Sequence, residues 1–339
     1  MFRTLLLVLT FTVLLSCDTN SNRSDVTVSN RAILVDNEPY VIKGICYHPV
    51  PKGSPNKRSW ATLTRDLQLM TEAGINTIRF YAPIDDIKVL DEISRAGLKV
   101  VIGFGYNQDG IFDIESGTFI NYVNKYKNHS AILMWELGNE FNYHPQWFDD
   151  EITNWYKAMN DAAGLIHTND SKHPTTTAHG DLPGALAISL SPNIDVWGMN
   201  VYRWDKPASI FKEWEALSSK PMYLSETGGD SYMKIAKAGY EQGENQKAQA
   251  DATKSILDEV FDNQDVCSGV TLFSFTDGWW KAGNNDVQDI GGHAPNSSGV
   301  PYDGAPNEEY WGIVDIYRQK KQAYTVLKEK YLSVNKTNK

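Results

Sequence analysis

Residues 131–140 read AILMWELGNE, a mostly apolar run that ends in a short turn and an Asn-Glu pair. A continuous apolar run that is bounded by a turn is typical of a strand buried on both faces, as in parallel sheets. The carboxyl ends of parallel strands gather at one edge of the sheet, where polar side chains meet. The stretch therefore predicts a buried strand that brings Asn139 and Glu140 to that edge.

The same signature recurs along the chain and predicts seven further strands. The expected strands are 41–47, 77–81, 99–104, 131–137, 174–178, 195–202, 221–227 and 269–276. The helical patterns between and after them cover 60–73, 84–96, 118–126, 151–166, 246–261 and 319–331. Strands that alternate with helices require a parallel sheet. Eight of them, each ending in polar or aromatic residues, favour an α/β fold of one domain, the closed (β/α)₈ or TIM barrel. A hairpin at 32–39 is expected to close its lower end.

Composition narrows the possible partners. The chain has 339 residues, with 42 acidic and 32 basic side chains and a net charge of −10. Nucleic acids and anionic membrane surfaces attract clustered Lys and Arg, so neither is an expected partner. The 10 Trp and 17 Tyr suit the flat faces of sugars, although core packing explains most of them. No glycine-rich phosphate loop follows a strand, which disfavours a dinucleotide-binding fold.

The first residues predict export rather than part of the fold. Arg3 precedes an apolar run at 5–15, which is too short to cross a bilayer and is typical of a secretory signal. Small or apolar residues directly before Cys17 resemble the lipobox of bacterial lipoproteins; the alternative is an ordinary signal peptide that ends near a free cysteine. The expected organisation is a signal at 1–17, a flexible tether at 18–30 and the barrel at 31–334. The protein would then be lipid-anchored through Cys17 to a bacterial membrane, periplasmic or at the cell surface, with no other membrane contact.

The other two cysteines are not expected to form a disulfide. Cys46 lies near the top of its predicted strand, and Cys267 lies just below the bottom of its own. At about 3.3 Å per residue, several strand positions separate them. That separation is far beyond the roughly 7 Å between Cα atoms that a disulfide tolerates.

Two carboxylates stand out at the predicted strand ends. Glu140 ends the fourth strand and Glu226 ends the seventh, so they face each other across the mouth of a barrel. Cleavage of a glycoside with retention of configuration needs such a pair about 5–5.5 Å apart, one residue as general acid and base and the other as nucleophile. The nucleophile must stay ionised, which a nearby cation and phenol favour, whereas the acid must start protonated. This chemistry needs no metal or organic cofactor.

With these residues in place, 33–331 resembles the clan A glycoside hydrolases, a group of retaining (β/α)₈ enzymes. The resemblance implies that Glu140 in WELGNE is the acid/base and that Glu226 in YLSET is the nucleophile. It implies a substrate-binding role for further residues. Tyr202 is expected to hydrogen-bond the nucleophile, Arg79 to hold it ionised, and Trp279 to form a platform under the sugar. Asn139 would donate a hydrogen bond to the sugar 2-hydroxyl.

Some of these positions have a second interpretation. His48 and His179 are expected either to contact substrate or to be satisfied histidines of the scaffold. Glu136 lies in the middle of its strand, so it is expected to pair with a basic or polar neighbour inside the barrel rather than to compete with Glu140. The loop 288–307, with nearby acidic residues Asp286, Asp289 and Asp303, is either a solvated acidic loop or a cation site.

Two resemblances indicate different substrates. The stretch 74–81, GINTIRFY, resembles clan families that act on β-1,3-glucans. The stretch 43–49, KGICYHP, resembles the family 2 barrel of β-galactosidases, β-glucuronidases and β-mannosidases, although the N-terminal sandwich domains of that family are not expected here.

The sequence thus predicts a monomeric glycoside hydrolase that cleaves β-glycosidic bonds in a polysaccharide or oligosaccharide. A β-glucan, 1,3-linked, is the favoured substrate. A transglycosylase on the same substrates and a non-hydrolytic surface glycan-binding protein are the alternatives.

Overall fold

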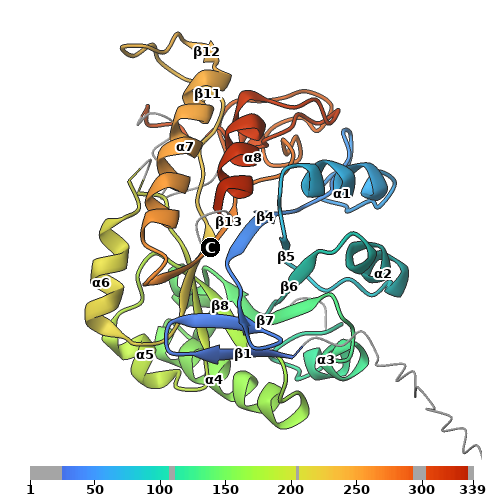
Figure 1. Ribbon diagram of the computed structural model, residues 1–339, viewed down its shortest axis with the longest axis vertical. Coiled ribbons are helices and arrows are strands. Elements are labelled where there is room, and N and C mark those ends of the chain that lie inside the picture. The colour runs from blue at the N-terminus through green and yellow to red at the C-terminus, as the bar shows by residue number, and fades with distance from the viewer. Residues whose placement is uncertain (1–24, 107–110, 204–205, 293–302, 335–339) are drawn as a thin grey trace, which may run out of the picture.

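The computed structural model describes residues 25–106, 111–203, 206–292 and 303–334. Within them, eight parallel strands form a closed barrel in the order β4-β5-β6-β7-β8-β9-β10-β13 (Figure 1). The strands are β4 (Ile42–Cys46), β5 (Thr77–Phe80), β6 (Lys99–Phe104), β7 (Ile132–Asn139), β8 (Thr175–Gly180), β9 (Val196–Asn200), β10 (Met222–Glu226) and β13 (Cys267–Leu272). The first and last barrel strands pair directly, with Ile42 beside Gly269, and this pairing closes the cylinder. The predicted single-domain (β/α)₈ barrel is confirmed.

A ring of helices surrounds the strands (Figure 1). The α-helices of the described residues are α1 (Leu63–Glu72), α2 (Ile87–Arg95), α3 (Phe119–Tyr126), α4 (Ile152–Asn169), α5 (Ala185–Leu190), α6 (Ser209–Leu217), α7 (Gln246–Asp262) and α8 (Gln322–Val334). Short 3₁₀ turns η1 (Phe141–Tyr143), η2 (Pro145–Phe148) and η3 (Glu308–Tyr310) and a small ribbon, β11 (Tyr232–Met233) with β12 (Gly243–Glu244), lie in the loops. No helix of the described residues is long and apolar enough to cross a membrane.

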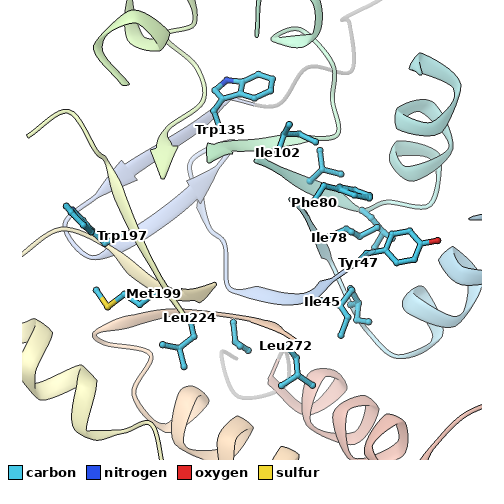
Figure 2. Packing of buried hydrophobic residues seen from close by; sticks show 14 of the residues in the cluster. Ile45, Tyr47, Ile78, Phe80, Ile102, Trp135, Trp197, Met199, Leu224 and Leu272 are labelled. Atoms are coloured by element: carbon cyan, nitrogen blue, oxygen red, sulfur yellow. The ribbon is translucent and has the colours of Figure 1, made fainter. Parts of the chain in front are cut away.

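The main core fills the space between strands and helices. Figure 2 shows large apolar side chains from successive strands pointing outward from the barrel, among them Phe80, Trp135 and Trp197, all fully buried. Full burial of a side chain of this kind contributes roughly 1.5–3 kcal/mol. In β6 and β7 consecutive apolar residues are buried on both faces of the strand, which is the continuous apolar pattern on which the prediction of these strands rests.

The lower end of the barrel is closed by a separate small sheet. Strands β1 (Val26–Ser29), β2 (Ala32–Val35) and β3 (Glu38–Pro39) pair antiparallel and appear in blue in Figure 1. Ile33 of this sheet is buried against residues near the start of the barrel strands, such as Ile42 and Val196. The predicted hairpin at 32–39 is confirmed, and β1 extends it.

Some elements differ from their prediction. Helices α5 and α6 were not expected, and the eighth strand is shifted toward the N-terminus, beginning at Cys267 and ending at Leu272. Cys46 and Cys267 are both buried and free, so the predicted absence of a disulfide is confirmed. The predicted signal, Cys17 and residues 18–24 of the tether lie outside the described residues. The prediction that the tether extends to residue 30 is wrong, because Val26–Ser29 forms β1 and pairs with β2.

Candidate active site

A kink at the end of β7 positions the Asn-Glu pair. Gly138 has φ +71°, and a Cβ there would lie 2.4 Å from the ring of Trp155. The pairing of β7 with β8 shifts register between Glu136 and Asn139, and Glu140 adopts a left-handed conformation with φ 56°. The Glu140 amide donates to the carbonyl oxygen of Ala178 at 2.7 Å. The kink therefore fixes where the side chains of Asn139 and Glu140 emerge.

These side chains line a cavity of about 500 Å³ at the carboxyl ends of the strands. The described lining includes Asn139 and Glu140 from β7, Glu226 from β10, and His48 and Tyr202 from the loops that follow β4 and β9. The structure thus brings together five of the site residues predicted from sequence, both carboxylates among them.

Glu226 is surrounded by hydrogen-bond donors. Its Oε1 accepts from Arg79 Nη1 at 2.7 Å and from the Tyr81 hydroxyl at 2.7 Å, and its Oε2 accepts from the Tyr202 hydroxyl at 2.8 Å. Burial, and then the charge of Glu226, raises the pKa of Tyr202 well above its usual value, so this phenol stays a donor. A cation and two phenols together therefore donate hydrogen bonds to both oxygens of Glu226.

Arg79 lies below the cavity rather than in it. Its side chain is fully buried, and its Nε and Nη2 bind both oxygens of Glu136 at 2.7 and 2.8 Å. Nη2 also donates to Oδ1 of Asn139 at 2.8 Å. Burial opposes the charge of Arg79, but the carboxylates of Glu136 and Glu226 outweigh it and raise its pKa. The predicted internal pairing of Glu136 is confirmed, and Arg79 binds the predicted nucleophile Glu226 as expected. Because two carboxylates and an amide enclose the guanidinium, Arg79 does not itself line the cavity.

Glu140 has the opposite environment to Glu226. Burial and then the charge of Glu226 raise the pKa of Glu140 to about 7, against a smaller lowering by the Asn200 side chain. Asn200 is itself held in place, donating to Asn139 Oδ1 at 3.0 Å and accepting from the Ser225 hydroxyl at 2.7 Å. One cavity therefore holds a carboxylate that accepts three hydrogen bonds and a second whose pKa is raised to about 7.

The tryptophan in the cavity is not the predicted one. Trp280 lines the cavity, with its ring 4.6 Å from that of His48. Trp279 lies outside the lining, where the Lys52 ammonium sits 4.7 Å from its ring centre and the Tyr317 ring meets its edge at 6.1 Å. The assignment of the platform to Trp279 is therefore wrong by one residue, because the chain after β13 turns the second ring inward.

His179 is a scaffold residue, which is the second of its two predicted interpretations. Its Nδ1 donates to the carbonyl oxygen of Asp181 at 2.9 Å, and its Nε2 accepts from the Tyr156 hydroxyl at 3.2 Å. The imidazole is almost fully buried, and burial lowers its pKa, which keeps the ring neutral. Both ring nitrogens are used by the protein, and the ring does not line the cavity.

Several lining residues were missed at the sequence level. Tyr81 directly follows β5, and a phenol just beyond a strand end was a signal that could have identified it. Lys281 and Glu308 also line the cavity, and their charged groups are 3.6 Å apart. They come from separate parts of the long segment after β13, where no periodicity predicts position. Trp311 packs edge-on against Tyr202 with the ring centres 5.3 Å apart.

The acidic loop after β13 shows no metal cluster in its described part. No group of three His, Cys, Asp or Glu side chains in the described residues is placed to hold a metal ion. Asp289 accepts from the backbone amide of Asn284 at 2.6 Å, and Asp303 accepts from that of Lys234 at 2.5 Å. Because 293–302 lies outside the described residues, the choice between a solvated loop and a cation site stays a prediction.

Comparisons with known proteins identify relatives. No protein-family model matches the chain. The β-glucuronidase of Mus musculus is 24% identical over 280 residues, which cover 74% of this chain and 41% of that protein. The β-galactosidase of Pseudoalteromonas haloplanktis is 23% identical over 164 residues, covering 45% of this chain and 16% of that protein. The chain thus spans about two fifths or less of the length of these curated relatives.

Solved structures agree on the fold. The GH2 β-galacturonidase of Eisenbergiella tayi bound to galacturonate covers 91% of this chain and 54% of its own, with a TM-score of 0.66 and 23% identity. The β-D-glucuronidase of Dictyoglomus thermophilum has a TM-score of 0.67 at 18% identity, with 91% of this chain and 53% of its own covered. The chain is therefore similar in sequence to a β-glucuronidase and a β-galactosidase and shares the fold of the GH2 structures, which agrees with its predicted resemblance to (β/α)₈ glycoside hydrolases.

Proposed function

We propose that this protein is a retaining β-glycosidase with Glu226 as nucleophile and Glu140 as acid/base. The observation that carries the proposal is the contrast between these carboxylates in one cavity. Three donors stabilise the Glu226 anion, while burial and Glu226 raise the pKa of Glu140 to about 7. A nucleophile and a proton donor are what the first step of double displacement needs.

The same geometry accounts for both halves of the reaction. An oxygen of Glu226 attacks the anomeric carbon, the bond to the leaving oxygen breaks, and Glu140 gives that oxygen its proton. Once Glu226 is esterified its negative charge is gone, so the pKa of Glu140 falls and its carboxylate can accept a proton from water. The resulting hydroxide attacks the anomeric carbon and releases Glu226. In this mechanism Asn139, whose Oδ1 is held by Arg79 and Asn200, donates a hydrogen bond to the sugar 2-hydroxyl.

Replacement of each carboxylate tests the assignment. Glu226→Ala is expected to lose at least 10⁴-fold in kcat on aryl β-glycosides, with activity partly restored by azide and a glycosyl azide of inverted configuration as product. Glu140→Ala with azide is expected to give the retained β-azide, because Glu226 still forms the covalent intermediate. Glu329→Gln, at an exposed carboxylate of α8 outside the cavity, is the matched comparison. Near-normal turnover by Glu226→Ala on every β-glycoside would refute the mechanism.

For the sugar at the cleavage site we propose a β-linked hexuronic acid or hexose, with uronides first. The relatives are named for glucuronides and galactosides, and a neighbouring structure holds galacturonate, whereas the predicted preference for β-glucan finds no support among them. Lys281 is the one lysine or arginine among the described residues that line the cavity. A sugar carboxylate would have to share Lys281 with Glu308, 3.6 Å from its ammonium.

Paired substrates decide between the sugars. The measurement is kcat/KM on the 4-nitrophenyl β-D-glucuronide, galacturonide, galactoside and glucoside and on β-1,3-gluco-oligosaccharides. For a uronide enzyme, Lys281→Met lowers kcat/KM on uronides at least 10-fold more than on the neutral sugars, and Glu308→Gln raises it on uronides. If kcat/KM of the wild-type enzyme is higher on the neutral glycosides than on the uronides, the substrate is a galactoside or a glucan instead.

The alternatives predicted from sequence share this site and stay open to experiment. A transglycosylase would yield products longer than its substrate, which sizing of the products detects. A non-hydrolytic glycan-binding protein would retain β-glycans without cleaving them over days.

We also propose export with a lipid anchor on Cys17, supported by the apolar run at 5–15 that precedes it. Labelling cells with radioactive palmitate tests this anchor, with Cys17→Ala as the variant that should lose the label. The proposed monomer is tested by light scattering.

A further inference from the structure

A second, smaller cavity continues from the first. It has a volume of about 290 Å³ and lies over the ends of β6 and β7. Both cavities are lined by Tyr81, Asn139, Glu140 and His144, so they meet along these side chains. Glu226 lines the first cavity but not the second. The proposed acid/base thus stands at the junction, and the proposed nucleophile lies on one side of it.

This placement determines which cavity holds each half of a substrate. The anomeric carbon must be within bonding reach of Glu226, so the sugar that is cleaved occupies the first cavity. The leaving oxygen must be within hydrogen-bond reach of Glu140, which faces both cavities. The group attached to that oxygen therefore extends from the junction into the second cavity.

The outer wall of the second cavity is an aromatic platform. The rings of His144 and Trp147 are stacked, with centres 4.1 Å apart and planes 12° from parallel. Trp147 is 51% exposed, although most large apolar side chains of this chain are buried. Phe141 supports it edge-on at 5.3 Å. These residues belong to η1 and η2 and the connection between them, so the turns that follow Glu140 also build the platform.

An exposed, supported tryptophan beside a cavity suits the apolar face of a sugar ring. We propose that Trp147, backed by His144, is the binding platform for the leaving-group sugar. The substrate is then a β-linked disaccharide or longer chain, and the platform also holds the sugar acceptor in any transfer reaction. This inference rests on the proposed glycosidase activity.

The test compares leaving groups that do and do not need a platform. The probes are β-D-glucuronyl, galactosyl and glucosyl fluorides, whose leaving group has no ring, and the matching disaccharides linked to glucose. Trp147→Ala is expected to lower kcat/KM on the accepted disaccharide at least 10-fold and to change that on the fluoride less than 2-fold. Trp147→Phe is expected to restore most of the loss. Tyr317→Ala, which removes a 54% exposed aromatic ring outside both cavities, is the control.

Two failures can be told apart. If the wild-type protein turns over none of the fluorides, the proposed glycosidase function fails. If it turns over both kinds of probe, and Trp147→Ala affects them equally or not at all, the activity stands and the platform is refuted. Addition of free glucose gives a second readout, because Trp147→Ala should lower the yield of transfer product from the fluoride without lowering fluoride release.

Discussion

At the scale of single residues, two glutamates of identical chemistry are separated by their surroundings. Glu226 accepts hydrogen bonds from a guanidinium and two phenols. For Glu140, burial and the negative charge of Glu226 raise the pKa more than the hydrogen bond with the Asn200 side chain lowers it. Two identical side chains therefore differ because one is surrounded by hydrogen-bond donors and the other by buried surroundings and a negative charge.

The pH dependence of the reaction follows from Glu140. Glu140 must be protonated to release the leaving group, so kcat/KM is expected to fall as the pH rises through about 7, the value to which its pKa is raised. The measurement is kcat/KM between pH 4 and 9 on a substrate with a poor leaving group. The fall should be much weaker for a glycosyl fluoride, which leaves with little help from a proton. An equally steep fall for both substrates would contradict the assignment.

A titration isolates the interaction between the carboxylates. In Glu226→Gln the negative charge beside Glu140 is absent, so the pKa of Glu140 is expected to drop below about 7. Nuclear magnetic resonance of ¹³C-labelled glutamate side chains follows this change in the free protein. Glu308→Gln, which removes a carboxylate elsewhere in the cavity lining, is the control. An unchanged titration of Glu140 in Glu226→Gln would show that Glu226 does not control its proton.

At the scale of elements, the end of β7 sets where the acid stands. Gly138 combines a positive φ with close approach to Trp155 of α4, so a methyl group there is both strained and crowded. Gly138→Ala is expected to lower kcat at least 100-fold by displacing Glu140, while stability falls by about 1–3 kcal/mol. Gly117→Ala, at a positive φ with no atom within 4 Å of the added carbon, is the matched control for backbone strain alone. Equal losses of activity in the two variants would contradict this role.

Arg79 ties three strands together beneath the site. From β5 it reaches Glu136 on β7 and Glu226 on β10, all within the barrel. Removal of one partner from a buried charge network is costly because it leaves the others unpaired, typically by 3–5 kcal/mol. Arg79→Met is therefore expected to lose about that much unfolding free energy, together with nearly all activity. Urea denaturation measures the loss against Arg95→Met on the exposed face of α2, and a cost below about 1 kcal/mol would contradict the network's role.

The strands could be predicted because buried parallel strands are apolar on both faces. Their helices were less certain. Helix α5 spans only six residues, Ala185–Leu190, which is too short to show a helical period, and α6 follows a Pro-containing connection. The last strand ends at Leu272 because the chain beyond it pairs with a segment outside the barrel, with the Ser274 amide donating to the Trp311 carbonyl. That contact depends on tertiary structure, which a local pattern does not reveal.

For the site, strand ends predicted the carboxylates but not all their neighbours. Glu140 comes directly after β7 and Glu226 is the last residue of β10, so a pattern that predicts where the strands end also predicts these two carboxylates. Trp279 and Trp280 are adjacent, so only the conformation of their loop decides which ring enters the cavity. His179 lies near the end of β8, as a catalytic residue would, but its Nε2 accepts a hydrogen bond from the Tyr156 hydroxyl of α4.

At the scale of the whole molecule, the residues of the candidate site and a sheet that contributes to stability lie at opposite ends of the barrel. The cavities lie at the carboxyl ends of the strands, and the sheet β1–β3 closes the opposite end. This division is general in (β/α)₈ barrels, in which the upper face carries the active site and the lower face contributes to stability. Ile33 is 1% exposed at that lower face and packs against Ile42 at the start of β4.

A mutation at Ile33 tests whether the two ends act independently. Ile33→Ala leaves a cavity under the barrel and is expected to cost about 2–5 kcal/mol of unfolding free energy. Because the site is built at the other end of the strands, kcat at a temperature where the variant stays folded should change less than 2-fold. Thermal unfolding and turnover of one aryl glycoside measure both, with Val28→Ala on the exposed face of β1 as the control. A 10-fold loss of kcat in the folded Ile33→Ala variant would show instead that the lower sheet helps to shape the site, and that the barrel transmits strain along its whole length.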